Sequence, residues 1–370
     1  MNKILIAMDS YKGTLSSLML ANIIKSHYPI KDASFTVLPI SDGGEGFVDA
    51  IAYSIQHKQI DLYVEDAFGN VIPTKYIIDD HETAIMELAL SSGLGMIEEK
   101  YRNPLKTSSY GLGQTMIDAL NRGVKKMIIG LGGSSTNDGG AGMLKAIGVR
   151  FYDDHHHEIE RLNGQTISMI SSIDFHEIDA RFKEVDIQVA CDVRNPLLGP
   201  MGATQVYARQ KGAKECQVNQ LERDMMHFAK VVHQSLNKDD RLLEGAGAAG
   251  GLGFALSSFL HAKLVSGFDI LANLVNLEDQ IRKSHLIITG EGKFDDQSFN
   301  GKVPVKIAEI SRKYKKTVIG IFGQSSVKDT GHIFDKTYSI VPKFASREEA
   351  LRDPQRIFID FIKNFNKTNV

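Results

Sequence analysis

The sequence has little of several features that would place it in particular classes of protein. Only two cysteines, Cys191 and Cys216, occur in 370 residues, so disulfide stapling is not expected and a reducing compartment is favoured. The 45 acidic residues nearly balance the 43 lysines and arginines. A net charge of −2 provides no field for attracting a nucleic acid or a membrane surface, so we expect neither among the partners.

Long apolar runs are also missing. No stretch approaches the roughly 20 apolar residues of a membrane span, and the run within MNKILIAM (1–8) is short for a signal peptide. The expected location is therefore the cytoplasm. A Walker phosphate loop is absent as well, because the Gly-Lys pairs at 292 and 301 are followed by Phe294 and Val303 instead of Ser or Thr.

The order of apolar runs predicts two domains of mixed α/β structure, as expected for a chain longer than a single core supports. Runs at both ends alternate with amphipathic helical segments, which is typical of a parallel sheet covered by helices. Residues 61–89 instead contain three short strands separated by turn signals, which favours an antiparallel meander. The strands expected in the parallel sheet are 3–8, 34–40, 285–289, 316–322 and 336–341.

From this order we predict a parallel Rossmann- or flavodoxin-like α/β domain built from residues 1–60 and 285–370. A second mixed α/β domain, residues 61–284, is inserted in it.

Charged residues stand beside glycine in four loops that follow these parallel strands: DSYKG, SDGGEG, GEGKFDDQ and FGQSS. Ligands of open α/β sheets collect at this edge. Glycine backbone and helix N-termini can bind anions there, and carboxylates can hold Mg²⁺, so the loops have the components of a phosphoryl-transfer site. One such loop alone would more often be a simple tight turn. The charged residues are Asp9, Lys12, Asp42, Glu45, Glu291, Lys293, Asp295 and Asp296.

The stretch GLGGSSTNDGGAGML (130–144) follows an apolar strand and precedes a helix. Its glycines leave backbone N–H groups accessible, and Asp138 stands where the helix needs an N-cap. We interpret the stretch as an anion cradle, although a capped glycine turn without a phosphate is an equally good interpretation of the pattern alone. The small donors available to it are Ser134, Ser135, Thr136 and Asn137.

Asp192 follows the apolar strand DIQVA (186–190) and precedes Arg194 and Asn195. An acid at a strand end beside a basic residue suits a general base or an Mg²⁺ ligand, and a structural ion pair is the alternative.

Two further patterns are better explained by structure than by function. GAGAAG (245–250) fits the dinucleotide-binding pattern, but no buried strand precedes it, so we expect close packing of a helix or a helix start in contact with substrate. The three histidines in DDHHHEIE (153–160) would alternate between the faces of a strand, which favours an exposed hairpin over a metal site.

Seven separated blocks of the sequence, in order along nearly the whole chain, resemble the type-1 glycerate kinase family of bacteria. The resemblance implies ATP-dependent phosphorylation of D-glycerate with Mg²⁺, most often to 2-phosphoglycerate, with 3-phosphoglycerate left open. It also implies two α/β domains, one inserted in the other, with the active site in the cleft between them. The blocks are AMDSYKGTLSS, SDGGEGFVDA, GLGGSSTNDGGAGMLKAIGVRF, ACDVRNPLLGPMGA, QKGA, GAGAAGGLG and ITGEGKFDDQSFNGKVPVKIA.

Carried over block by block, the resemblance places residues on the active site. Lys12 is expected to clamp the carboxylate of glycerate, and Asp192 or Asp42 to deprotonate the attacking hydroxyl. The residues expected around the substrate are Asp9, Ser10, Gly43, Gly44, Glu45 and Asp295. Those expected around ATP are Gly133, Ser134, Ser135, Asn137, Asp138 and Lys211. The expected Mg²⁺ ligands are Asp192 and Glu291.

The sequence departs from the family at three places. Met8 replaces the usual proline, YARQKG (207–212) replaces the common FGPQKG and puts Arg209 near Lys211, and Lys293 replaces arginine. A monomer or homodimer is expected. The alternative functions are a non-catalytic regulator that senses hydroxy acids, or a sugar-acid phosphatase or isomerase with the same anion-binding loops. Formation of ADP that requires glycerate distinguishes the kinase from both.

Overall fold

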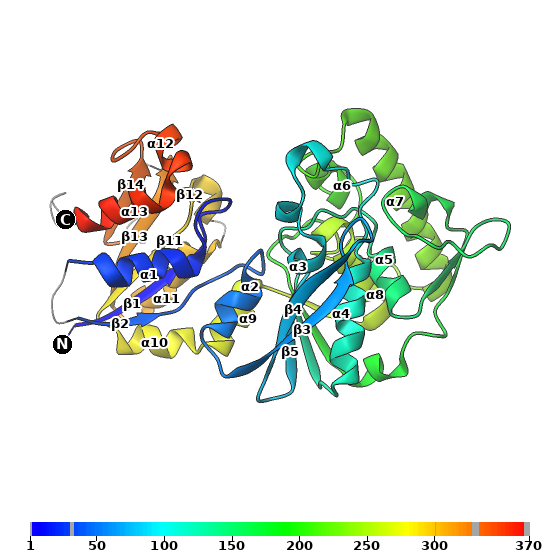
Figure 1. Ribbon diagram of the computed structural model, residues 1–370, viewed down its shortest axis with the longest axis horizontal. Helices are drawn as coiled ribbons and strands as arrows, with labels where there is room; N and C mark the ends of the chain where they lie inside the picture. The colour runs from blue at the N-terminus through cyan, green and yellow to red at the C-terminus, as the bar shows by residue number, and fades with distance from the viewer. Residues whose placement is uncertain (1, 30–32, 300, 328–332, 366–370) are drawn as a thin grey trace. The chain divides into compact units, whose positions relative to one another are not determined.

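The computed structural model describes residues 2–29, 33–299, 301–327 and 333–365 of the chain (Figure 1). They form two compact units. The first comprises residues 1–42, 49–55 and 268–370, and the second comprises 43–48 and 56–267. The chain thus enters the second unit first at Gly43, inside the SDGGEG stretch.

The first unit contains one sheet in which every pairing is parallel. The strand order is β12-β13-β11-β1-β2, and β14 also pairs with β13. The five strands predicted from the sequence are all present, while the two-residue strand β12 was too short to predict. The bounds are β1 Asn2–Met8, β2 Ala33–Val37, β11 Leu286–Gly290, β12 Lys293–Phe294, β13 Thr317–Ser325 and β14 Lys336–Val341.

Helices cover both faces of this sheet. Ile4, Ile6 and Met8 alternate along β1 toward the face on which α1 and α13 pack, and α10 and α11 contact β1 and β11 from the other face. This arrangement confirms the predicted parallel α/β layers. The bounds are α1 Ser17–His27, α9 Gly267–Leu274, α10 Leu277–Lys283, α11 Val303–Lys313, α12 Arg347–Arg352 and α13 Pro354–Lys363.

The second unit contains a mixed sheet of order β10-β9-β6-β5-β4-β3 and a separate pair of strands, β7 and β8. Strands β5, β6, β9 and β10 are parallel, and β3, β4 and β5 form the antiparallel meander expected from the sequence. The bounds are β3 His57–Glu65, β4 Val71–Asp79, β5 Thr83–Glu87, β6 Lys126–Gly130, β7 Arg150–Tyr152, β8 Ser172–Asp174, β9 Asp186–Ala190 and β10 Lys263–Val265.

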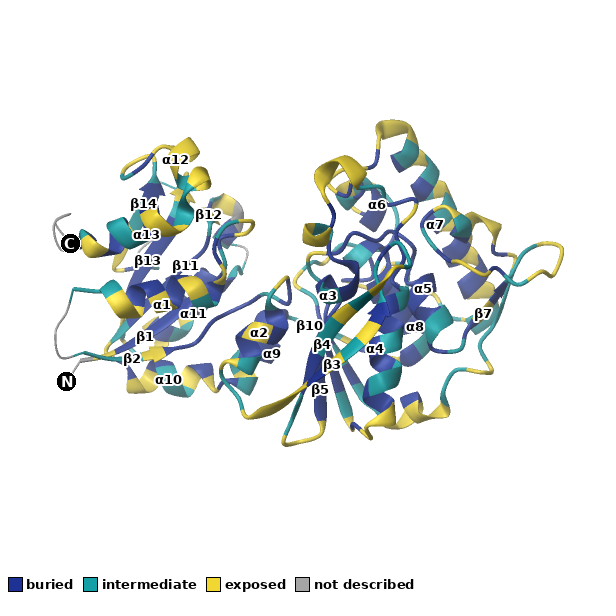
Figure 2. Cartoon of the chain, viewed as in Figure 1, coloured by how far each residue is buried: buried dark blue, intermediate teal, exposed yellow. Residues whose placement is uncertain are grey.

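Helix α4 packs on β3 and β5, α5 packs on α4, and α8 packs on α5 and β10. Together with the strands they enclose the larger apolar core, which is dark in Figure 2. The bounds are α3 Ala89–Ser92, α4 Tyr110–Asn121, α5 Ala141–Ala146, α6 Ala203–Tyr207, α7 Glu215–Leu236 and α8 Leu252–Leu260. Helix α2, Phe47–Ala52, begins in the second unit and continues into residues of the first.

The histidine run 155–157 and the glycine pattern 245–250 both have the structural roles expected from the sequence. The three histidines are exposed in a turn beyond β7. The glycines of 245–250 pack closely, since a Cβ at Gly250 would lie 2.1 Å from the carbonyl oxygen of Thr136. The second unit begins before the expected residue 61, since it includes residues 43–48 and 56–60, and it ends before residue 284, since α10 and nearly all of α9 group with the first unit. Among the described residues no helix has the length and apolarity that crossing a membrane requires.

Replacing Gly113 by alanine should lower the free energy of unfolding by about 1–3 kcal/mol, because its Cβ overpacks the contact between α4 and α5. That Cβ would lie 2.5 Å from the carbonyl oxygen of Met143 and 2.6 Å from Cβ of Ala146. The better helix propensity of alanine recovers only about 1 kcal/mol. Urea denaturation measures the change, and a variant more stable than the wild type would contradict this packing.

Candidate active site

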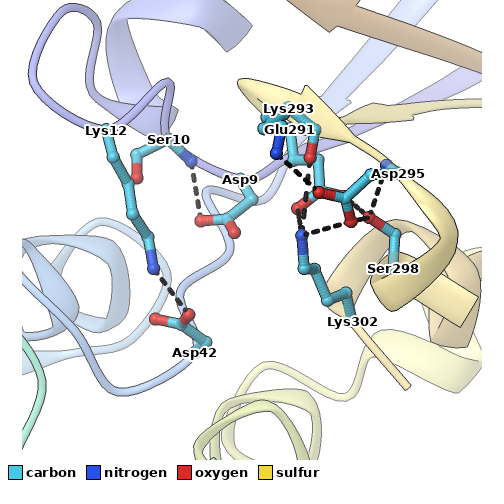
Figure 3. Close-up of polar contacts among 9 residues, drawn as sticks. All are labelled: Asp9, Ser10, Lys12, Asp42, Glu291, Lys293, Asp295, Ser298 and Lys302. Carbon is cyan, nitrogen blue, oxygen red and sulfur yellow. Dashed lines mark hydrogen bonds and ion pairs between the residues drawn. The ribbon is translucent and has the colours of Figure 1, made fainter. Parts of the chain in front are cut away.

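The carboxyl edge of the parallel sheet in the first unit gathers four charged side chains that the sequence singled out (Figure 3). Met8 pairs with Gly290 on the neighbouring strand, so Asp9 and Glu291 leave adjacent strands at the same level. Asp42 arrives from the loop after β2, with its Oδ2 3.0 Å from Nζ of Lys12. Three acids and one ammonium group are thus assembled from segments that are far apart in sequence.

Asp9 is the most perturbed acid of this group. Its side chain is buried, with only 6% of the residue exposed. Burial, reinforced by the nearby charges of Asp42 and Glu291, raises the pKa of Asp9 to about 7. Lys12 and the backbone N–H of Ser10, which donates to Asp9 Oδ1 over 2.7 Å, act in the opposite direction. Asp9 therefore changes charge close to neutral pH.

Glu291 is held by two residues that the sequence analysis missed. Ser298 Oγ donates to its Oε1 over 2.7 Å, and Nζ of Lys302 lies 3.4 Å from its Oε2. Burial raises the pKa of Glu291 even though both contacts oppose the shift. Asp295 lies beside this group, with Oδ2 2.9 Å from Nζ of Lys293. The only signal for Ser298 and Lys302 was their place in the block that contains Glu291.

In the second unit, two neighbouring strands bring the glycine-rich loop of residues 131–138 and Asp192 to one edge of the sheet. Gly130 at the end of β6 pairs with Ala190 at the end of β9. Residues 131–138 continue from the first strand, and the exposed Asp192 follows two residues after the second. The carboxyl ends of parallel strands thus bring an acid to the same edge as the glycine-rich loop.

The turn 43–46 lies directly against the start of this loop. The N–H of Gly132 donates to the carbonyl oxygen of Gly43 over 3.0 Å. A Cβ on Gly132 would lie 2.3 Å from Cα of Gly44, and a Cβ on Gly43 would lie 2.9 Å from Cβ of Ala190. Only glycine permits these approaches.

Most of the polar side chains in the loop are used to brace it. Ser135 Oγ donates to the carbonyl oxygen of Ser92 over 2.8 Å, and Thr136 Oγ1 to that of Ala249 over 3.2 Å. Asn137 Nδ2 donates to Thr204 Oγ1 over 3.2 Å. From the sequence we expected these groups to donate to a ligand, whereas in the structure they donate to acceptors inside the unit.

Two backbone N–H groups in the same loop, unlike these side chains, make no hydrogen bond to the described residues. Gly133 is exposed and has a φ of +72°. Within the described residues, the N–H groups of Gly133 and Ser134 donate to no acceptor. Gly133 is thus an exposed glycine turn with an unpaired N–H group, an arrangement that can bind a phosphate oxygen, while Ser134 itself is only 8% exposed.

Asp138 also has an internal role. Its Oδ2 accepts hydrogen bonds of 2.8 Å from both the N–H and the Oγ of Ser109, and its Oδ1 accepts from the N–H of Gly140 over 3.1 Å. The N-cap position of α5 belongs to Gly140, not to Asp138 as expected, because Gly139 and Gly140 take positive φ and delay the helix. Burial raises the pKa of Asp138, which is fully enclosed.

Lys211 lies beneath the loop and is only 3% exposed. Its Nζ donates to Ser134 Oγ over 2.9 Å and to the carbonyl oxygen of Thr136 over 2.7 Å. Burial lowers the pKa of Lys211 to about 7, and the charge of Asp138 only partly opposes this shift. The side chain thus ties two residues of the loop together.

Known proteins resemble this chain along almost its whole length. The model of the glycerate kinase family matches residues 4–368. The chain belongs to the glycerate kinase family. It is 40% identical to the glycerate 2-kinase of Escherichia coli K12, with 95% of this chain and 93% of the relative covered. Identity is 38% to the glycerate kinase of Halalkalibacterium halodurans, with 98% and 97% covered.

A solved structure gives the same result for the fold. The crystal structure from Salmonella typhimurium LT2 described as a candidate glycerate kinase 2 superposes with a TM-score of 0.82 at 37% identity. The match covers 99% of this chain and 98% of that one. The mixed α/β fold predicted from the sequence is therefore that of a glycerate kinase family member.

Replacing Asp9 by asparagine should stabilise the protein, and the gain should be about 1–3 kcal/mol larger at pH 8 than at pH 5. The pKa of Asp9 is about 7 in the folded chain against an ordinary 3.8. Folding therefore takes up a proton between these values, and stability is lost as the pH rises through 7. Asparagine keeps an acceptor for the N–H of Ser10 and carries no charge.

Urea denaturation of the variant and the wild type at both pH values measures this difference. Asp154→Asn, on an exposed turn, is the matched control and should show no such dependence. An Asp9→Asn variant destabilised equally at both pH values would rule out the raised pKa.

Proposed function

We propose that this chain transfers the γ-phosphoryl group of ATP to the 2-hydroxyl of D-glycerate, forming 2-phosphoglycerate and ADP. The observation that carries the proposal is a pair of backbone N–H groups, those of Gly133 and Ser134, that have no acceptor among the described residues and lie in a glycine turn at the same sheet edge as Asp192. Membership of the glycerate kinase family supports glycerate as the substrate, and similarity to the glycerate 2-kinase of Escherichia coli supports the 2-hydroxyl as the acceptor.

The second unit offers groups for the triphosphate and the attacking hydroxyl. We assign the γ-phosphate to the N–H groups of Gly133 and Ser134, with Lys211 holding their turn in shape. Asp192 takes the proton of the glycerate hydroxyl. The hydroxyl oxygen of glycerate bonds to the γ-phosphorus while the bond from that phosphorus to the ADP oxygen breaks. The turn 43–46, which contacts Gly132, is assigned to the substrate.

The first unit offers charge for an anionic substrate and for Mg²⁺. We assign Lys12 to the carboxylate of D-glycerate, because its side chain is exposed and its ammonium group already pairs with a carboxylate, that of Asp42. Glu291 is assigned to Mg²⁺, since a buried carboxylate with a neighbouring acid is a hard oxygen donor set. Mg²⁺ would supply neutralisation of the phosphate charge. The described residues contain no group of three metal-ligating side chains, and ATP-bound Mg²⁺ usually needs only one or two carboxylates.

The purified protein should form ADP only when MgATP and D-glycerate are both present, and the product should be 2-phosphoglycerate. Phosphorus NMR identifies the product, because phosphorus couples to the single C2 proton in 2-phosphoglycerate and to both C3 protons in 3-phosphoglycerate. Glycerol and L-glycerate serve as controls for the carboxylate and the configuration. ADP formation independent of glycerate, or release of phosphate from phosphoglycerate without nucleotide, would refute the proposal.

Asp192→Asn should lower kcat by about 10²–10⁴-fold, because the amide cannot accept the hydroxyl proton. The Kd of ATP should stay within about threefold of wild type, since the Gly133 turn is unchanged. Asp186→Asn is the matched control: the same change at the opposite end of β9, where the side chain pairs with Lys263. Equal turnover in both variants would eliminate Asp192 as the base.

A further inference from the structure

Glu87 is a buried acid that the sequence analysis did not single out. It ends β5 and is only 5% exposed. Its Oε1 accepts the N–H of Gly46 over 3.1 Å, and its Oε2 accepts the N–H of Val48 over 2.8 Å. Both carboxylate oxygens therefore hold backbone groups at the start of α2.

The segment that Glu87 holds has little order of its own. Residues 43–48 contain three glycines, and Gly43 and Gly46 have positive φ. Helix α2 is only six residues long, which is too short to be stable by itself. A carboxylate that accepts two N–H groups at a helix N-terminus forms charge-assisted hydrogen bonds and also opposes the positive end of the helix dipole. Glu87 is thus a principal anchor of this segment.

The same residue borders the phosphate loop. Glu87 pairs with Gly130 in the sheet, and a Cβ on Gly130 would lie 3.3 Å from Cβ of Glu87 and 2.9 Å from the carbonyl oxygen of Gly43. Two residues further on, the N–H of Gly132 donates to that same Gly43 carbonyl oxygen. One side chain therefore supports the place where the 43–46 turn meets the 130–133 turn.

We propose that Glu87 is a positioning residue for the acceptor substrate: it fixes the 43–46 turn against the phosphate loop, and so determines where D-glycerate meets the γ-phosphate. The inference rests on the proposed function, because that function assigns the 43–46 turn to glycerate. It adds a residue that contacts neither substrate and acts through the backbone of Gly46 and Val48. The phosphate loop itself has other supports in Ser92 and Lys211.

Glutamine at position 87 tests this assignment. Glu87→Gln keeps the volume of the side chain but replaces one acceptor oxygen with an NH₂ group that cannot accept the N–H of Gly46 or Val48. We expect the KM for D-glycerate to rise about tenfold or more, the cost of one lost charge-assisted hydrogen bond, while the KM for ATP stays within about twofold. A KM for glycerate that is unchanged, or that rises by the same factor as the KM for ATP, would overturn the proposal.

Glu222→Gln is the matched control. Glu222, on α7 of the same unit, also accepts a backbone N–H, that of Gly199 over 2.8 Å. The Glu222→Gln variant should leave the ratio of the two KM values unchanged, which separates a general loss of packing from a loss of positioning. If Glu87→Gln does not fold, Glu87→Asp carries the same test, because it keeps the charge but is one methylene too short to reach both amides.

Amide hydrogen exchange separates the failure of this inference from the failure of the proposed function. If the wild type forms no ADP with D-glycerate, the proposed function fails. Independently of activity, Glu87→Gln should speed exchange in a peptide covering 43–48 and leave 134–138 as in the wild type. Unchanged exchange in 43–48 would overturn the positioning role.

Discussion

Direct packing of backbone on backbone in the second unit is the constraint on which the glycine-rich loop of residues 130–138 depends. Gly132 lies against Gly44, Gly43 against Ala190, and Gly250 against Thr136, in each case closer than a Cβ would permit. A loop packed in this way cannot be held by its own side chains at the points of contact. The loop is held instead by hydrogen bonds, from Ser135 Oγ to the carbonyl oxygen of Ser92 and from Nζ of Lys211 to Ser134 Oγ. Among the described residues, the N–H groups of Gly133 and Ser134 at this turn donate to no acceptor.

In the first unit the constraint is electrostatic, because the strand ends bring several carboxylates close together. Asp9 is buried beside Asp42 and close to Glu291, an arrangement that raises its pKa and costs stability above neutral pH. Such a cost is expected where carboxylates are kept for binding or chemistry, since a purely structural edge would replace one of them with a neutral residue. Lys12 lowers this cost at Asp9 without removing it, and Lys302 opposes the raised pKa of Glu291.

The sequence predicted the fold well because its signals are local. Short apolar runs followed by glycine and charge mark parallel strand ends, and every strand predicted for the parallel sheet is present. The candidate site was less predictable. Whether Ser135 donates to a ligand or to the protein depends on Ser92, 43 residues away, and no pattern in the sequence encodes that contact. Glu87 was missed because it stands in the apolar stretch AIMELAL, where core packing is the simpler interpretation.

The most direct test of this account follows the two backbone N–H groups on which the phosphate assignment rests. Backbone amide resonances of isotope-labelled protein can be recorded with and without saturating MgADP. We expect the resonances of Gly133 and Ser134 to be among the most strongly shifted, because their N–H groups gain phosphate acceptors. Nucleotide that binds while both resonances stay in place would show that the phosphates are held elsewhere.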